Sequence, residues 1–89
     1  MTSDDLFEYA KTVRTREDFV KFVELLNQDW HTHKGEWENI DLQSFLEGLS
    51  GFARNVSGYY QNMGEPMDPE KITWRMVAEM LLAATVHGN

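Results

Sequence analysis

The sequence predicts an all-α fold, a compact bundle of about four helices, and three observations lead to it. Apolar residues recur at spacings of three and four, which is the period of one helix face. Residues that begin helices stand before these stretches, and glycines stand near several of their ends. No stretch shows the apolar and polar alternation that is typical of a strand. We therefore expect one domain, 1–89, with helices at about 3–12, 15–33, 41–62 and 69–87.

The first two helices are predicted from their apolar faces and, in the second, from a cap. The apolar side of the first helix is short: Leu6, Phe7 and Ala10. In the second, Thr15 is the expected N-cap, and Asp18 stands three residues on, as in a capping box. One face of this helix then carries Phe19, Phe22, Val23, Leu26 and Trp30. The spacing of these residues marks one helical face, and the pattern fades over residues 31–35, where Gly35 suits the position after a helix end.

The third helix is expected to begin after Asp41, whose carboxylate suits an N-cap. Its apolar stripe consists of Leu42, Phe45, Leu46, Leu49, Phe52, Ala53 and Val56. Gly48 and Gly51 lie within this stripe, and we expect them to let a neighbouring helix approach closely. The helix is expected to bend or to end early around Ser57–Gly58, because glycine weakens a helix interior, and residues 59–62 can extend it to a stop near Gly64.

The fourth helix is expected to begin at Asp68–Pro69, a capping acid followed by the helical position that best tolerates proline. Thr73 offers an alternative start. From residue 74 to residue 86, only Arg75, Glu79 and Thr85 are polar. A helix that is apolar nearly all round is either the most buried element or meets a partner subunit.

The composition favours a soluble, acidic protein. The net charge is −7, and residues 35–53 contain no Lys or Arg. This balance opposes binding to nucleic acid or to an anionic membrane, because both depend on basic residues, and it favours a basic protein partner. The absence of Cys fits a reducing compartment, and the acidic start does not resemble a secretory signal, so we expect a cytoplasmic protein.

The predicted site for a partner lies between the second and third helices, where polar and aromatic residues gather. Its residues are Glu36, Trp37, Glu38, Asn39, Asp41 and Glu47. The acids suit a basic surface, and a large aromatic residue in a loop suits an interface anchor. Two other interpretations stay open: Trp37 closes the end of the bundle, and the acids form a solvated face.

Catalytic and metal-binding motifs are absent from the sequence. It contains no phosphate-binding glycine loop, nucleophile elbow or cysteine nucleophile, so we expect no enzyme activity, catalytic residue or cofactor. His31 and His33, with Asp29 or Glu36, are the only candidates for a metal-dependent enzyme. Residues two apart on a helix point away from each other, so we expect no metal site.

A resemblance supports the fold. The block Trp37-Glu38-Asn39 with Leu42 and Phe45-Leu46-Glu47 is similar to a family of small, uncharacterised bacterial and phage-associated helical domains. Later positions extend the similarity over about residues 15–87: Tyr60, Trp74, Ala78, Leu81, Ala83 and Ala84. The resemblance implies an all-helical domain of unknown function, with residues 37–39 as a shared site or a shared structural corner.

Together these observations favour a small acidic interaction module, immunity-like or regulatory, that binds a basic protein. The alternative is a structural homodimer that pairs through the helix around Trp74–Val86 and has no catalytic role.

Overall fold

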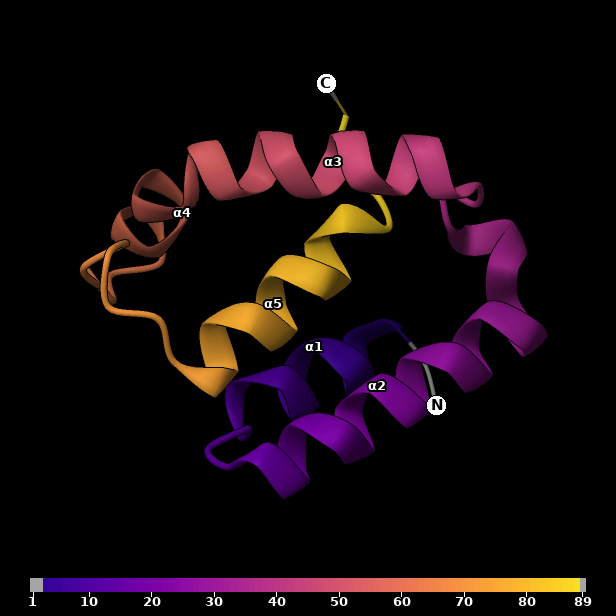
Figure 1. Cartoon of the computed structure of the whole chain (residues 1–89), viewed down its shortest axis with the longest axis horizontal. Coiled ribbons are helices and arrows are strands. Elements are labelled where there is room, and N and C mark those ends of the chain that lie inside the picture. Colours follow the sequence, from indigo (N-terminus) through magenta and orange to yellow (C-terminus); the bar gives the residue numbers. More distant parts are fainter. Residues whose placement is uncertain (1–2, 89) are drawn as a thin grey trace.

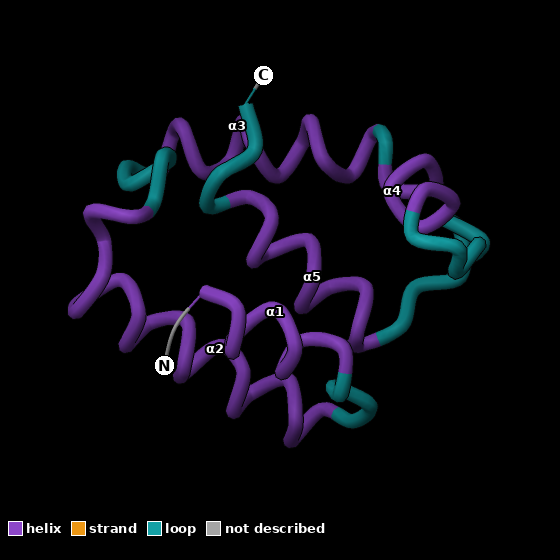
Figure 2. Tube along the Cα trace, turned by 180° about the vertical axis from the view of Figure 1, so that it is seen from behind, coloured by secondary structure: helices purple, strands orange, loops and turns teal. Residues whose placement is uncertain are grey.

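Helix α5 (Trp74–Ala84) lies at the centre of the structure, with the other helices on two sides of it (Figure 1). The computed structural model describes residues 3–88. The remaining elements are α1 (Ser3–Lys11), α2 (Arg16–His33), the short 3-10 helix η1 (Lys34–Glu36), α3 (Leu42–Arg54) and α4 (Val56–Asn62). α5 packs against α3 on one side and against α1 and α2 on the other, as the view from behind also shows (Figure 2).

The all-α prediction is confirmed, since the described residues form helices and loops without a strand. The helices begin at capping side chains that the local sequence provides. Thr15, Asp41 and Thr73 each accept a hydrogen bond from the backbone N–H three residues on, at 3.1, 2.7 and 3.1 Å. Such caps satisfy N–H groups that have no partner within the helix. The caps predicted at Thr15 and Asp41 are therefore confirmed.

The predicted start of the last helix at Asp68–Pro69 is wrong, and the range 69–87 is too long at both ends. Asp68 instead forms a turn. Its Oδ1 accepts a hydrogen bond from the backbone N–H of Glu70 at 2.9 Å, and its carbonyl oxygen accepts one from the backbone N–H of Lys71 at 3.1 Å. This turn does not continue into a helix, because the next helix begins only at Trp74. The alternative start at Thr73 is the one that the structure uses.

The predicted helix 41–62 is two helices, so residues 3–88 form five α-helices where about four were expected. The chain breaks at Asn55, two residues before the predicted bend at Ser57–Gly58. The side-chain amide of Asn55 donates a hydrogen bond to the carbonyl of Gly51 at 3.3 Å, and the backbone N–H of Asn55 donates to the carbonyl of Phe52 at 3.0 Å. An Asn side chain that bonds nearby carbonyls competes with the helix, and this explains the break.

The stop predicted near Gly64 is confirmed. Gly64 has a φ of +73°, which glycine adopts without strain. Around it, the N–H of Glu65 donates to the carbonyl of Tyr60 at 2.9 Å, and that of Gly64 donates to Gln61 at 3.1 Å. These two bonds form a Schellman motif, which ends α4 and turns the chain towards α5.

The core consists of two apolar clusters, and α5 contributes to both. The first joins α1, α2 and α5 through Leu6, Ala10, Val13, Phe22, Leu26 and Ala78. The second joins α3, α4 and α5 through Phe52, Val56, Tyr60 and Met76. The chain's own helices therefore cover two sides of α5, as expected for a helix that is apolar nearly all round. Across residues 3–88, none of the helices has the length and hydropathy needed to cross a bilayer.

Candidate functional site

The loop between η1 and α3 caps the end of α5. The backbone N–H groups of Glu38 and Asn39 both donate to the carbonyl of Thr85, at 3.0 and 2.9 Å. The side-chain amide of Asn39 donates to the carbonyls of Ala84 and His87, each at 2.8 Å. Carbonyls at the end of a helix lack donors within that helix. Asn39 therefore supplies a C-cap to α5 from a distant part of the chain.

Gly48 on α3 leaves the space that this cap needs. A Cβ at Gly48 would lie 2.7 Å from Nδ2 of Asn39, 2.8 Å from the carbonyl oxygen of Ala84 and 2.9 Å from that of His87. These distances are shorter than real contacts of a Cβ atom. The packing role predicted for this glycine is thus confirmed: its missing side chain lets α3 lie against the end of α5.

Trp37 joins the same loop to α2 and α3. Its ring is half-buried against the first core cluster and stacks on Phe45 with the ring centroids 6.4 Å apart. Its indole Nε1 donates to Oδ2 of Asp29 at 2.8 Å, and Asp29 is itself buried. We name the residues Trp37, Asn39 and Gly48 the corner, because together they fix how α2, α3 and α5 meet.

The acidic members of the predicted site lie outside the corner. Glu36, Glu38, Asp41 and Glu47 are exposed. Hydrogen bonds from the backbone N–H and the hydroxyl of Ser44 hold the pKa of Asp41 below its usual value. The six predicted residues therefore fall into two groups: Trp37 and Asn39 are half-buried in the corner, and the four acids are exposed. Partner binding by these residues stays a prediction.

The outer face of α3 carries apolar side chains that the sequence placed in the core stripe. Leu42 is 72% exposed and Leu46 is 51% exposed, one helical turn apart, and Ile40 before the helix is 54% exposed. A shallow groove follows this face, lined by Leu42, Gln43, Leu46, Glu47, Ser50, Gly51 and Arg54. The expected burial of Leu42 and Leu46 is wrong, because α3 turns Gly48, Gly51 and Phe52 inward instead.

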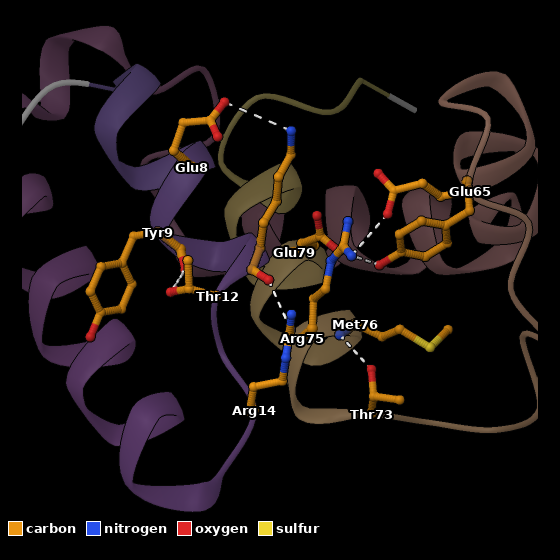
Figure 3. A network of polar contacts seen from close by, with 11 residues as sticks. Glu8, Tyr9, Thr12, Arg14, Glu65, Thr73, Arg75, Met76 and Glu79 are labelled. Carbon is orange, nitrogen blue, oxygen red and sulfur yellow. Dashed lines mark hydrogen bonds and ion pairs between the residues drawn. The ribbon is translucent and has the colours of Figure 1, made fainter.

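A buried network of polar side chains joins α4 and α5, and the sequence analysis did not identify it. The hydroxyl of Tyr60 donates to Oε1 of Glu79 at 2.6 Å, and Nε of Arg75 donates to the same oxygen at 3.0 Å. Arg75 also pairs with Glu65 through Nη1 at 2.9 Å, and Figure 3 shows its guanidinium between the two acids. The signal in the sequence was a pair of opposite charges four residues apart, Arg75 and Glu79, on an otherwise apolar helix.

The network sets the ionisation of its members. Burial raises the pKa of Tyr60 far above its usual value of 10, and the hydrogen bond to Glu79 adds to this effect. The hydrogen bond and charge of Arg75 lower the pKa of Glu65. Burial acts to lower the pKa of Arg75, but Glu65 and Glu79 together outweigh it and raise that pKa. At neutral pH the phenol is thus protonated and the guanidinium charged.

His31 and His33, near the end of α2, do not converge on a metal site. His33 Nδ1 lies 3.3 Å from Oδ1 of Asp29, and His31 is exposed with its ring edge against Trp30, at a centroid distance of 5.3 Å. Within residues 3–88, no three side chains of the kinds that bind metals are grouped to hold an ion.

The fold and its corner define a small helical domain whose polar loop is tied to its last helix. Residues 15–88 match the family of unknown function DUF7660, so the chain belongs to this family. The matched range includes the corner and α5, which confirms the resemblance to a domain of unknown function. Comparisons with curated proteins and with solved structures gave no match.

Proposed function

We propose that this chain is a protein-interaction module, not an enzyme, and that it binds a basic partner protein through the outer face of α3. One observation carries the proposal: Leu42 and Leu46 expose most of their side chains on a segment, residues 35–53, that contains no Lys or Arg. Exposed apolar residues one turn apart form a continuous strip on a helix. A strip of this kind with a polar border is typical of a protein interface.

The charges around the strip favour a basic partner. Glu47 lines the same groove as Leu42 and Leu46, and Glu38 and Asp41 are exposed in the segment before α3. Arg54 at the far end of the groove is the first basic residue after Lys34. Acidic residues at the border of an interface attract a basic surface and speed its approach. The partner that fits is therefore a protein with an apolar patch surrounded by Lys and Arg. By covering that patch, the module would act as an immunity or regulatory protein does.

The corner residues are not part of the outer face of α3, but they fix the position of this helix. Asn39 and Gly48 hold the start of α3 against α5, so the strip lies on a fixed helix. Most apolar residues of α5 are less suited to bind a partner, since α1, α2 and α3 pack against this helix, although Trp74 at its start is 41% exposed. The outer face of α3 thus has more support as an interface than the helix around Trp74–Val86.

The test is affinity capture from a lysate of the native host, followed by mass spectrometry. Three forms of the chain are compared: wild type, Leu42→Ser/Leu46→Ser, and Glu38→Lys/Glu47→Lys. The matched control is Glu24→Lys/Glu70→Lys, which makes the same charge change at exposed positions on other parts of the chain. A basic protein that binds wild type and the control, but neither α3 variant, is the expected result.

The captured protein is then titrated against each form at low and high salt. We expect the Lys variant to lose most of the salt dependence of binding, since screening acts on the charges that it reverses. If the α3 variants bind as tightly as wild type, the proposed interface is wrong.

A further inference from the structure

The groove along the outer face of α3 has a form into which a second helix packs. Its lining residues form two rows along the helix, and within each row they are four positions apart. The rows are Leu42, Leu46, Ser50 and Arg54, and Gln43, Glu47 and Gly51. Side chains four apart form the ridges of a helix, and the groove between two ridges receives a ridge of another helix. α3 lies along one edge of the molecule, where a second molecule can approach it (Figure 1).

The side chains along this groove change from large to small. Leu42 and Leu46 in the first half of α3 are exposed, whereas Ser50 and Gly51 in the second half are small. Large side chains pack best opposite small ones on the facing helix. α3 runs from Leu42 to Arg54, so residue 48 is at its middle. A second α3 that runs in the opposite direction, centred on this residue, would place residue 46 of each copy opposite residue 50 of the other.

The two ends of α3 carry opposite charges. Asp41 caps the start of the helix and Arg54 is its last residue, and both are exposed. Arg54 forms no ion pair with the part of the chain that the structure describes. In an antiparallel pair, the guanidinium of Arg54 would lie beside Asp41 of the other copy, and its aliphatic stem would lie on Leu42. Opposite charges would thus meet at both ends of the pair.

We infer that two copies of this chain form a symmetric dimer in which their α3 helices pack antiparallel along this groove. A twofold interface is complementary to itself, since each of its contacts occurs twice. The outer face of α3 meets this requirement in shape, with leucines opposite small residues, and in charge, with Arg54 opposite Asp41. A parallel pair would instead place Leu46 on Leu46 and Asp41 beside Asp41.

The affinity of the dimer is kept low by repulsion between acids. Glu47 of each copy lies near the twofold axis, and each chain has a net charge of −7. The interface also uses a single short helix from each copy, so we expect a Kd of about 10–100 µM.

The dimer covers Leu42 and Leu46, the side chains that the proposed function assigns to a basic partner. A second copy and the partner therefore compete for this face, and the chain binds its partner as a monomer. This competition rests on the proposed function, whereas the dimer itself does not.

The test is analytical ultracentrifugation of the purified chain between about 1 µM and about 1 mM, a range that includes the expected Kd. The buffer contains about 0.15 M salt, at which charges more than about 8 Å apart are largely screened. We expect the mass to rise from one chain to two, and Leu42→Ser/Leu46→Ser to remain a monomer. Both leucines are exposed in the monomer, so this variant should keep its helix content in circular dichroism.

A charge exchange tests the antiparallel arrangement. Arg54→Glu brings two acids together at both ends of the dimer, and Asp41→Lys brings two bases together, so each should weaken dimerisation about tenfold. An equal mixture of the two variants joins the introduced acid to the introduced base at one end and keeps the native pair at the other. We expect the mixture to dimerise as wild type does. The matched control is Lys21→Glu at an exposed position on α2, which should have no effect.

Glu47→Gln separates the dimer from the proposed function, because it should change the two affinities in opposite directions. Loss of the repulsion at the twofold axis should tighten the dimer, whereas loss of an acid should weaken binding to a basic partner. The ultracentrifugation uses the chain alone, so its result does not depend on whether a partner is captured. A dimer without a captured partner upholds the inference and counts against the proposed function.

Three results would each overturn the inference. The first is a monomer at about 1 mM, at least ten times the expected Kd. The second is a dimer that survives Leu42→Ser/Leu46→Ser but is lost in Trp74→Ser, which would place the interface at the exposed start of α5. The third is a dimer that Arg54→Glu does not weaken, and this result decides the arrangement even if Asp41→Lys, which loses its cap, does not fold.

Discussion

Gly48 and Asn39 are packed so closely that a residue larger than glycine does not fit at position 48. A side chain at Gly48 would place its first carbon 2.7 Å from the amide nitrogen with which Asn39 caps α5. The carbonyls that receive this cap belong to residues 45 and 48 positions further along the chain. One missing methyl group on α3 thus permits a contact between the middle of the chain and its last helix.

The first prediction concerns Gly48→Ala. Alanine is a better helix former by about 1 kcal/mol, but its Cβ meets two backbone carbonyls and the Asn39 amide, and such overpacking costs typically about 1–3 kcal/mol. We expect a net loss of free energy of unfolding, measured by urea denaturation. The control is Gly58→Ala on α4, where a Cβ would have no neighbour within 4 Å, and it should stabilise the chain by up to about 1 kcal/mol. Equal effects at both positions would contradict the close approach.

The second prediction is that Asn39→Asp destabilises the chain more than Asn39→Ala. Aspartate at this position turns a donor into an acceptor and faces two carbonyl oxygens with a negative charge at the negative end of a helix dipole. We expect a loss of about 2–4 kcal/mol for Asp and about 1–3 kcal/mol for Ala, as for a buried group left unsatisfied. Thermal unfolding followed by circular dichroism measures both. Asn27→Asp, an exposed position on α2 with the same charge change, should have little effect.

The third prediction concerns Tyr60 and alkaline pH. Burial and the hydrogen bond to Glu79 raise the pKa of Tyr60 in the folded state, so folding favours the protonated phenol. This contribution is complete below the unfolded pKa of about 10 and is lost as the pH rises above it. We expect the free energy of unfolding of wild type to fall as the pH rises above about 9 to 10, and to fall less in Tyr60→Phe.

The same variant has a cost at neutral pH. Tyr60→Phe removes a donor from the buried carboxylate of Glu79, which should cost about 1–3 kcal/mol. If Tyr60→Phe is as stable as wild type at pH 7, and its free energy of unfolding falls as steeply at alkaline pH, this hydrogen bond does not contribute to stability. Tyr59, whose pKa burial also raises, contributes to the slope that remains.

Features that depend on neighbouring residues were predicted well. The caps at Thr15 and Asp41 follow from one side chain and the amide three residues on, and both are present in the structure. Where two local signals compete, the sequence does not decide between them. Asp68 and Thr73 both suit an N-cap, and the turn at Asp68 left the role to Thr73.

The side of a helix that faces the core was harder to predict. The apolar stripe of α3 is wide enough to include Leu42 and Leu46 as well as Phe52, and period alone does not say which edge α5 covers. The hydrogen bonds of the corner and of the buried network could not be predicted either, because their partners are far apart in the sequence. Asn39 meets Ala84 across 45 positions, and Tyr60 meets Glu79 across 19, and no spacing rule connects residues so far apart.

The central place of α5 has a consequence for the order of events during synthesis. Both apolar clusters need residues of α5, which is the last helix to leave the ribosome among those described. Until it emerges, the faces of α1, α2 and α3 that it covers remain open to water. The nascent chain is therefore expected to stay unfolded, and open to chaperones and proteases, until α5 has been made, and then to fold cooperatively.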